Sequence, residues 1–339
     1  MAITTYGDIS PRTAGFAAKK LLERGQFLMV TERFGQVDPQ GKKKTKTRKY
    51  RRYESLARAD APLAEGVSPA GQQLTFTDVI ATLEQYGDSV KLTDVIQDTH
   101  EDDVLMESME LAGEQAAETI EVLRINVLKG GSNVAYANGV TSRAAVASPA
   151  TRGDLRLIYR SFRKNKARQI SKVVKASAMV STEPVAAAYF MMGSTDCDAD
   201  LRGLTGFVPA EQYSNSGMMF EGEIGKMENV RVILTALFEP WLSAATSAAG
   251  QSTYLTNGTT GTGSADVYPL ITVARDGYAI VPLQGTNAVT PMVLNPGTPS
   301  KSDQLGQVGF VSWKTWQTAA ILNQNWVNRL EVAATQSPS

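Results

Sequence analysis

The chain has 339 residues and a formal net charge of +0, so it is long enough for one large or two ordinary domains and has no global attraction to nucleic acid. Its single cysteine, Cys197, excludes a disulfide within the chain and indicates a reducing compartment. No apolar run approaches the roughly 20 residues of a membrane span, and the N-terminus lacks the basic and apolar parts of a signal peptide. We therefore expect a soluble intracellular protein with no membrane partner.

The first segment, residues 1–41, is typical of an arm. Its opening residues are rich in Thr, Gly, Ser and Pro, which favour irregular structure. A short helix is predicted over residues 13–25 and extended chain over residues 27–34. This segment buries too little apolar surface to fold alone, so we expect it to lie on another surface.

Residues 42–96 are predicted to form a long two-stranded excursion. A basic strand comes first, then a tip over residues 55–73 that Pro and Gly break, then a return over residues 74–96 interrupted at Gly87 and Asp88. A hairpin with so few apolar residues is marginal alone and needs a surface to lie on. The basic strand contains Lys42, Lys43, Lys44, Lys46, Arg48, Lys49, Arg51 and Arg52.

Residues 99–131 are predicted to form one long amphipathic helix. Apolar residues recur at spacings of three and four, Thr99 can cap the start, and Gly130 and Gly131 mark the end. The same helix carries an acidic stripe formed by Glu107, Glu110, Glu114, Glu118 and Glu121. Like charges at spacings of three and four residues repel by roughly 0.2–0.5 kcal/mol per pair. Either this stripe is a solvated face or a basic partner lies across it.

The rest of the chain predicts helices and strands in unequal runs. Asn138 and Gly139 indicate a tight hairpin, and residues 244–265 are a Gly/Ser/Thr-rich surface loop. The unequal runs favour an α+β fold. Helices are predicted over 152–166 and 197–204, and strands over 185–192, 230–238, 268–274, 279–283 and 308–312. The helix over 152–166 has a basic side formed by Arg152, Arg156, Arg160, Arg163, Lys164 and Lys166.

No motif in the chain predicts catalysis. Asp196, Asp198 and Asp200 resemble the start of a calcium loop, but Leu201 and Phe207 stand where that loop needs Gly and Glu, so a helix cap is the better interpretation. Walker, GxGxxG and GxSxG motifs are absent from the sequence. We expect no catalytic residue, no cofactor and no metal.

Several long stretches resemble one protein family. They are ITTYGDISPRTAGFAAKKLLERGQ, TLEQYG, LTDVIQDTHEDDVLMESMELAGEQAAETIE and RKNKARQI in the first half, and, more loosely, FEPW at 238–241 and GFVSWKTWQTAAILNQNW at 309–326. With the order of arm, basic hairpin, long helix and mixed body, the chain resembles the major capsid proteins of tailed bacteriophages, which have the Johnson fold. The stretches are similar to those of podophages with a virion-borne RNA polymerase.

The resemblance implies a structural subunit that assembles through pentamers and hexamers into an icosahedral capsid around double-stranded DNA. Implied partners are further copies of the chain, scaffolding, portal and decoration proteins, and DNA bound without regard to sequence. Assembly in the host cytoplasm and residence in the virion follow. The implied divisions are an N-terminal arm (1–41), an extended loop (42–98), a peripheral domain with a spine helix (99–185), an axial domain with an insertion near 244–265 (186–305), and a C-terminal return to the peripheral domain (306–339).

Two sets of site residues follow from these hypotheses. The basic strand and the acidic stripe each repel themselves, so we expect Lys42–Arg52 of one subunit to lie over the stripe of its neighbour. The basic side of the helix over 152–166 is expected to include residues that face packaged DNA, with a solvated or intersubunit face as the alternative. Two other functions stay open: a non-viral compartment shell of the same fold, and a nucleic-acid-binding protein that uses residues 42–52.

Overall fold

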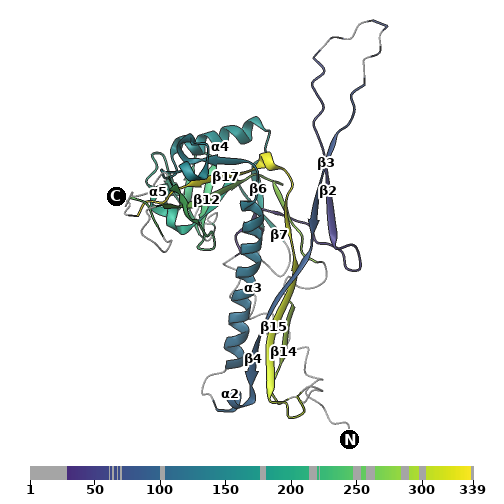
Figure 1. Ribbon diagram of the computed structural model, residues 1–339. Coiled ribbons are helices and arrows are strands. Elements are labelled where there is room, and N and C mark those ends of the chain that lie inside the picture. Colours follow the sequence, from purple (N-terminus) through teal and green to yellow (C-terminus); the bar gives the residue numbers. More distant parts are fainter. Residues whose placement is uncertain are drawn as a thin grey trace.

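The computed structural model describes residues 29–60, 62, 65–66, 68, 71–99, 104–175, 181–213, 220, 222–246, 253–256, 264–283, 290–297 and 303–336. These residues form a compact body, a long stalk that runs away from it, and a two-stranded hairpin that projects from the junction of the two (Figure 1). Helices and mostly antiparallel strands occur together, as the α+β prediction requires.

The stalk is built around α3 (Val104–Lys129). Met109, Ala112 and Ala116 recur on one side of this helix and share a core with Val311 and Trp313. Those last two residues belong to an antiparallel sheet of β14 (Thr290–Leu294), β15 (Val308–Gln317) and β4 (Glu84–Thr93), and α2 (Asp94–Thr99) follows β4. Small alanines on the helix let the sheet pack closely along it.

The body is a nine-stranded sheet with the order β5-β17-β12-β7-β10-β9-β8, to which β11 adds on β12 and β6 on β7. Its central strands are buried on both faces, which explains the unbroken apolar run Tyr189–Met192. The strands are β5 (Val134–Tyr136), β6 (Ile170–Lys175), β7 (Ser181–Gly193), β8 (Val208–Pro209), β9 (Glu223–Met227), β10 (Val230–Leu234), β11 (Trp241–Ala245), β12 (Ala265–Val273) and β17 (Val327–Val332).

Two different helices cover the two faces of this sheet. On one face, α4 (Arg152–Lys164) packs Leu155, Ile158 and Phe162 against the sheet, with the short α5 (Asp198–Arg202) in the same layer. On the other face lie the last turns of α3, through Ile125 and Leu128, together with residues from the N-terminal part of the described chain. The stalk helix is therefore also part of the body's core.

Smaller elements fill the junction between stalk and body. A three-stranded sheet has the order β1 (Gln36–Val37), β13 (Tyr278–Ile280) and β16 (Ala319–Ile321). The projecting hairpin pairs β2 (Thr47–Tyr53) with β3 (Phe76–Thr82). Short 3₁₀ turns are η3 (Thr31–Arg33), η4 (Ala137–Gly139), η5 (Arg143–Ala145), η6 (Thr195–Cys197), η7 (Ala210–Gln212) and η10 (Gln324–Trp326).

Several predicted boundaries are wrong, each for a local reason. The basic strand begins at Thr47, because residues 42–46 form a turn in which Lys43 has φ 58°. The return strand breaks at Leu83, which is buried, and continues through Gly87 and Asp88. Thr31–Arg33 is a 3₁₀ turn instead of extended chain. The helix predicted over 13–25 and residues 100–103 at the predicted helix start lie outside the described residues.

The hairpin predicted at Asn138 and Gly139 is also wrong. Both residues have the positive φ that such a turn needs, 57° and 70°. However, β5 before them pairs in parallel with β17, and the chain after them forms no strand against β5. Asn138 and Gly139 therefore have the backbone conformation of a tight turn, but the partner strand of β5 is the distant β17.

The sheets divide the chain differently from the expected boundaries. β15 belongs to the stalk, whereas β17 pairs with β12 inside the body, so residues 306–339 serve both parts. α4 packs on the body's sheet, although 99–185 was expected to form one domain with the spine helix. β4 lies along the stalk, so the hairpin ends before residue 84.

Candidate assembly surfaces

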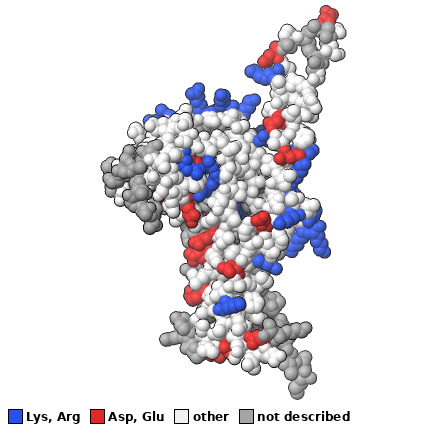
Figure 2. Space-filling model, viewed as in Figure 1, with Lys and Arg blue, Asp and Glu red and all other residues white. Residues whose placement is uncertain are grey.

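An acidic row follows one side of α3. Glu107 is exposed and Glu110, Glu114 and Glu118 are half-buried. Figure 2 shows acidic side chains gathered along the stalk below the body. We call these glutamates the acidic row; they place a line of negative charge at the surface of the stalk.

Glu121 does not belong to this row, which corrects the sequence prediction. Its side chain is 0% exposed. Glu121 Oε1 accepts from the N–H groups of Val30 (3.1 Å) and Thr31 (2.8 Å), and Oε2 accepts from Thr31 Oγ1 (2.7 Å). Since the carboxylate is enclosed by its own chain, it cannot contact a neighbouring subunit.

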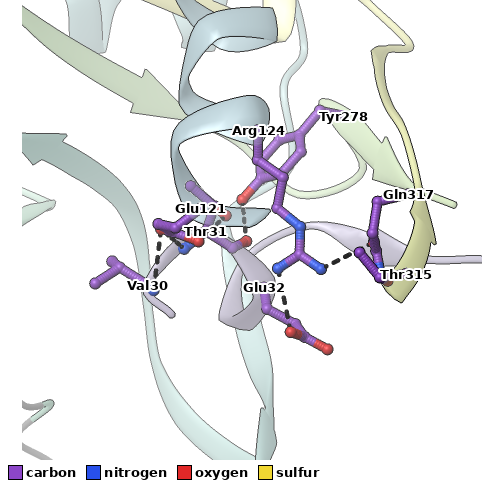
Figure 3. Close-up of polar contacts among 8 residues, drawn as sticks. All are labelled: Val30, Thr31, Glu32, Glu121, Arg124, Tyr278, Thr315 and Gln317. Atoms are coloured by element: carbon purple, nitrogen blue, oxygen red, sulfur yellow. Dashed lines mark hydrogen bonds and ion pairs between the residues drawn. The ribbon is translucent and has the colours of Figure 1, made fainter. Parts of the chain in front are cut away.

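Glu121 is the centre of a group of polar contacts, here called the Glu121 cluster, that joins residues 30–32 at the end of the arm to α3, β13 and β15 (Figure 3). Arg124 Nη1 donates to Glu32 (3.1 Å) and Nη2 to Gln317 Oε1 (3.3 Å), and the Tyr278 hydroxyl donates to the Thr31 carbonyl (2.5 Å). Burial raises the pKa of Glu121, against the opposing effects of Arg124 and Thr31. The only feature of the sequence that points to this cluster is the i, i+3 spacing of Glu121 and Arg124, which places the two side chains on the same side of α3.

The basic segment has acidic partners in its own chain, contrary to expectation. Arg48 Nη2 lies 2.6 Å from Asp38, and Asp78 receives both Arg51 Nε (2.8 Å) and Lys49 Nζ (2.7 Å). Hydrogen bonds from Arg51 and then Lys49 hold the pKa of Asp78 well below its usual range. Arg52 pairs with Glu54 at 2.8 Å. The second half of the segment is therefore neutralised locally.

The lysines at the start of the basic segment gather in one turn. Residues 42–46, here called the lysine turn, contain Lys42, Lys43, Lys44 and Lys46, and all of these side chains are exposed. Figure 2 shows basic side chains clustered beside the junction, below the hairpin. This surface, and not the strand itself, is the strongest basic feature near the hairpin.

The hairpin exposes apolar side chains beyond its root. Tyr53, Leu74, Phe76 and Ile80 are 51–62% exposed. The root is held by a small core that includes Ala81, Leu83, Val281 and Ala320. Figure 1 shows the backbone of the distal half running away from the body and the stalk. Tyr53 and Phe76 contact each other edge to face, and Arg51 lies over the Phe76 ring.

α4 has the basic side that its sequence predicts. Thr151 and Asp154 form a capping box at its start, with Thr151 Oγ1 accepting from the Asp154 N–H. Arg152 and Arg156 both pair with Glu228, an acid that the prediction missed because it lies in the distant turn between β9 and β10. Arg160, Arg163, Lys164 and Lys166 are exposed and form no ion pair with the described residues.

The other candidate motif is structural. Asp198 pairs with Arg202, and Asp200 accepts from the Thr335 N–H at 2.8 Å. Cys197 is buried, which raises its thiol pKa. Within the described ranges, His, Cys, Asp and Glu form no group of three that could hold a metal ion. No helix in the described part of the chain is long and apolar enough to cross a bilayer.

An elongated subunit with a projecting hairpin, a long stalk helix and a separate α+β body is the architecture of tailed-phage capsid proteins. The chain belongs to the phage capsid protein family, whose model matches residues 76–325. This family consists of structural proteins and not of enzymes. The match favours the capsid hypothesis over the compartment shell and over a nucleic-acid-binding protein.

Individual relatives are distant. The chain is 23% identical over 232 residues to the major capsid protein of Pseudomonas phage KPP21. That similarity covers 64% of this chain and 57% of the relative, so the chain spans less than two thirds of the relative's length. This likeness and the family match support the predicted family at the level of phage capsid proteins.

Solved capsids share the fold. The capsid protein of Ralstonia phage GP4 superposes with a TM-score of 0.64 at 12% identity, covering 91% of each chain. The capsid of cyanophage Pam1 gives a TM-score of 0.59 at 13% identity over 88% of this chain and 89% of that one. The head of Helicobacter pylori bacteriophage KHP40 gives 0.58 at 13% identity over 88% and 87%. These likenesses confirm the predicted capsid fold.

Proposed function

We propose that this protein is the subunit of an icosahedral capsid that self-assembles through pentamers and hexamers and encloses double-stranded DNA. The observation that carries the proposal is the hairpin, on which Tyr53, Leu74, Phe76 and Ile80 each keep more than half of their surface exposed among the described residues. Apolar side chains grouped in this way favour burial against a partner. Every copy of the chain carries the same exposed apolar side chains on its hairpin. A neighbouring copy is therefore the partner that can bury them in every subunit.

The proposal assigns each part of the chain to a part of the capsid fold. The hairpin is the extended loop, the stalk is the peripheral domain with α3 as its spine, and the body is the axial domain that meets other copies around a capsomer centre. We further propose separate scaffolding, portal and decoration partners, assembly in the host cytoplasm, and kinship with podophages that carry an RNA polymerase in the virion.

Self-assembly is tested by expressing the full chain alone and with its scaffolding protein. Light scattering and negative-stain images should show closed particles, tubes, sheets or capsomers. A chain that stays monomeric under all of these conditions would contradict the proposal.

Between neighbours, we propose that the lysine turn of one subunit lies against the acidic row of the next. The two surfaces carry opposite charge, and both are accessible. Each exposed pair adds only ~0–1 kcal/mol, less at high salt. The pairs nevertheless recur at every neighbour contact, so their sum biases assembly.

Charge reversal tests this contact. Glu107→Lys with Glu118→Lys should weaken assembly while leaving the unfolding transition of the free subunit unchanged. Adding Lys43→Glu with Lys44→Glu should restore part of the assembly. The control pair, Glu211→Lys with Glu239→Lys, reverses exposed acids on the body and should assemble as wild type does. If the combined variant assembles no better than the acidic-row variant, the pairing is wrong.

For α4, we propose that Arg160, Arg163, Lys164 and Lys166 face the packaged genome. Such contacts are to phosphate and carry no base specificity. Replacing all of these residues by Gln should reduce the salt dependence of DNA binding by dispersed subunits, since each lost phosphate contact lowers the slope by about one. A shell structure with these side chains on its outer surface would refute the assignment.

A further inference from the structure

The projecting hairpin is joined to the rest of the described chain by two short backbone links. One is Leu83, which separates β3 from β4, and the other is the lysine turn that leads into β2. β2 and β3 pair only with each other, whereas β4 belongs to the sheet of the stalk. Short links between separate sheets act as hinges, so the direction of the hairpin depends on side chains that restrain it.

The two faces of β2 have different partners. The strand is half-buried at Arg48, Tyr50 and Arg52 and exposed at the residues between them. Because successive side chains of a strand point to opposite faces, these three residues share one face. The basic residues of the other face pair with Asp78 of β3, inside the hairpin. The half-buried face is therefore the one that contacts the junction.

Arg48 makes the inner contact with the junction. Its Nη2 and Nε donate to Asp38 Oδ2 at 2.6 and 3.1 Å, and its Nη1 donates to Gln40 Oε1 at 3.4 Å. The Asp38 N–H in turn donates to the Ile280 carbonyl at 2.9 Å, and the Gln40 N–H donates to the Pro282 carbonyl at 2.8 Å. Arg48 therefore ties β2 to backbone that is itself fixed beside β13.

Arg52 makes the outer contact. Its Nη1 donates to the Leu322 carbonyl at 3.3 Å, while its Nη2 donates to Glu54 within the hairpin. Leu322 directly follows β16, and its N–H donates to the Gly277 carbonyl at 2.9 Å. Arg52 lies four strand residues beyond Arg48, about 13 Å at ~3.3 Å per residue. Two contacts that far apart oppose tilting of the hairpin more effectively than one contact at its base.

We infer that Arg48 and Arg52 are positioning residues, which fix the direction of the hairpin in the free subunit. A hairpin that already points in one direction loses less conformational freedom when it meets a neighbour. The consequence for assembly rests on the proposed function, and the inference adds which side chains prepare the hairpin for it. These two arginines are thereby assigned to the junction of their own chain, and not to the acids of a neighbour or to DNA.

Pairs of spin labels on dispersed subunits measure the direction of the hairpin. One label is attached to Gln73→Cys on the hairpin and the other to Asn126→Cys on α3. Both positions are exposed, and the native Cys197 is buried and does not compete for the label. Asp38→Ala with Arg52→Ala removes both contacts with the junction. The distribution of distances between the labels should then widen about twofold or more, because few other contacts restrain the hairpin.

A matched control separates direction from charge. Asp78→Ala with Arg51→Ala also removes one acid and one arginine, but from the ion pair inside the hairpin. This control should keep the width of the wild-type distance distribution. Cooperative unfolding in urea verifies that each variant folds. If Asp38→Ala with Arg52→Ala does not fold, Arg52→Ala alone tests the outer contact in the same way.

Assembly provides the second measurement. Asp38→Ala with Arg52→Ala should raise the protein concentration needed for assembly about threefold or more. The inference is wrong if this variant keeps the wild-type distribution of distances, or if the control variant widens the distribution equally. If wild type itself never assembles, the proposed function fails, while the distances in the free subunit still decide whether the two arginines fix the direction of the hairpin.

Discussion

The Glu121 cluster makes a quantitative prediction about how the arm is held. Val30 and Thr31 are 3% and 0% exposed, and both donate their N–H groups to Glu121. Glu121→Ala leaves these donors without an acceptor, at about 1–3 kcal/mol each. We therefore expect the free energy of unfolding to fall by about 2–6 kcal/mol.

Glu121→Gln separates hydrogen bonding from charge. The amide oxygen can still accept from Val30 and Thr31, and the amide nitrogen can donate to Thr31 Oγ1. The free energy of unfolding of Glu121→Gln should therefore fall by only about 0.5–1.5 kcal/mol, the contribution of one ordinary hydrogen bond. Urea unfolding of the free subunit, followed by tryptophan fluorescence, measures both variants. Equal unfolding free energies for Glu121→Ala and Glu121→Gln would refute the reasoning.

The difference in unfolding free energy between wild type and Glu121→Gln should depend on pH. Because burial raises the pKa of Glu121 above its ordinary 4.5, the folded chain binds this proton more tightly than the unfolded chain. The contribution of this proton to stability is fully present below the unfolded pKa and is lost as pH rises through the folded pKa. Wild type should therefore gain stability relative to Glu121→Gln as pH falls through that window. A constant difference would contradict the burial argument.

Other contacts make further predictions. Thr151→Ala removes the cap of α4 and should cost about 1 kcal/mol in urea unfolding, whereas Thr151→Ser should cost little; equal losses would exclude capping as the cause. Gly87→Ala would place a Cβ 2.5 Å from the Trp313 carbonyl oxygen, so thermal unfolding should shift down, while Gly71→Ala, with open space around it, should leave the transition in place. Arg143→Met removes both hydrogen bonds (2.7 and 2.8 Å) to the buried Glu331. The free energy of unfolding should fall by up to about 3–5 kcal/mol, less the share of the pairing that Arg329 retains, and Arg143→Lys should lose less. No change in urea unfolding would show that Arg329 alone keeps Glu331 paired.

Sequence reasoning succeeded where the signal is local. The apolar periods of α3 and α4 lie in neighbouring residues, so sequence predicts both helices, and the predicted ranges end two residues beyond Lys129 and Lys164. A strand is also predicted over residues 185–192, and in β7 its end, Tyr189–Met192, is covered on both faces by helices of the stalk and the body. Resemblance to capsid proteins then gave the order of the parts and the family.

Reasoning failed where partners come from far along the chain. Helical periodicity puts Glu121 beside Glu118, but it cannot indicate that Thr31 covers only the former. Asp78 lies directly across from Arg51 in the hairpin register, and a register assigned from sequence would have revealed this pair. The parallel pairing of β5 with β17 joins residues nearly 200 positions apart, and no short-range pattern encodes it.

The shared core of stalk and body has a mechanical consequence. Ile125 and Leu128 at the end of α3 are buried against the same sheet that α4 covers from the other side. We therefore expect the stalk and the sheet to tilt together as one rigid unit. The hairpin, by contrast, joins the rest of the described chain through the small core around Leu83 and Ala320 and a few polar contacts such as Arg48–Asp38. If copies of this chain meet neighbours at different angles, we expect the base of the hairpin to bend while the stalk and the sheet keep their relative position.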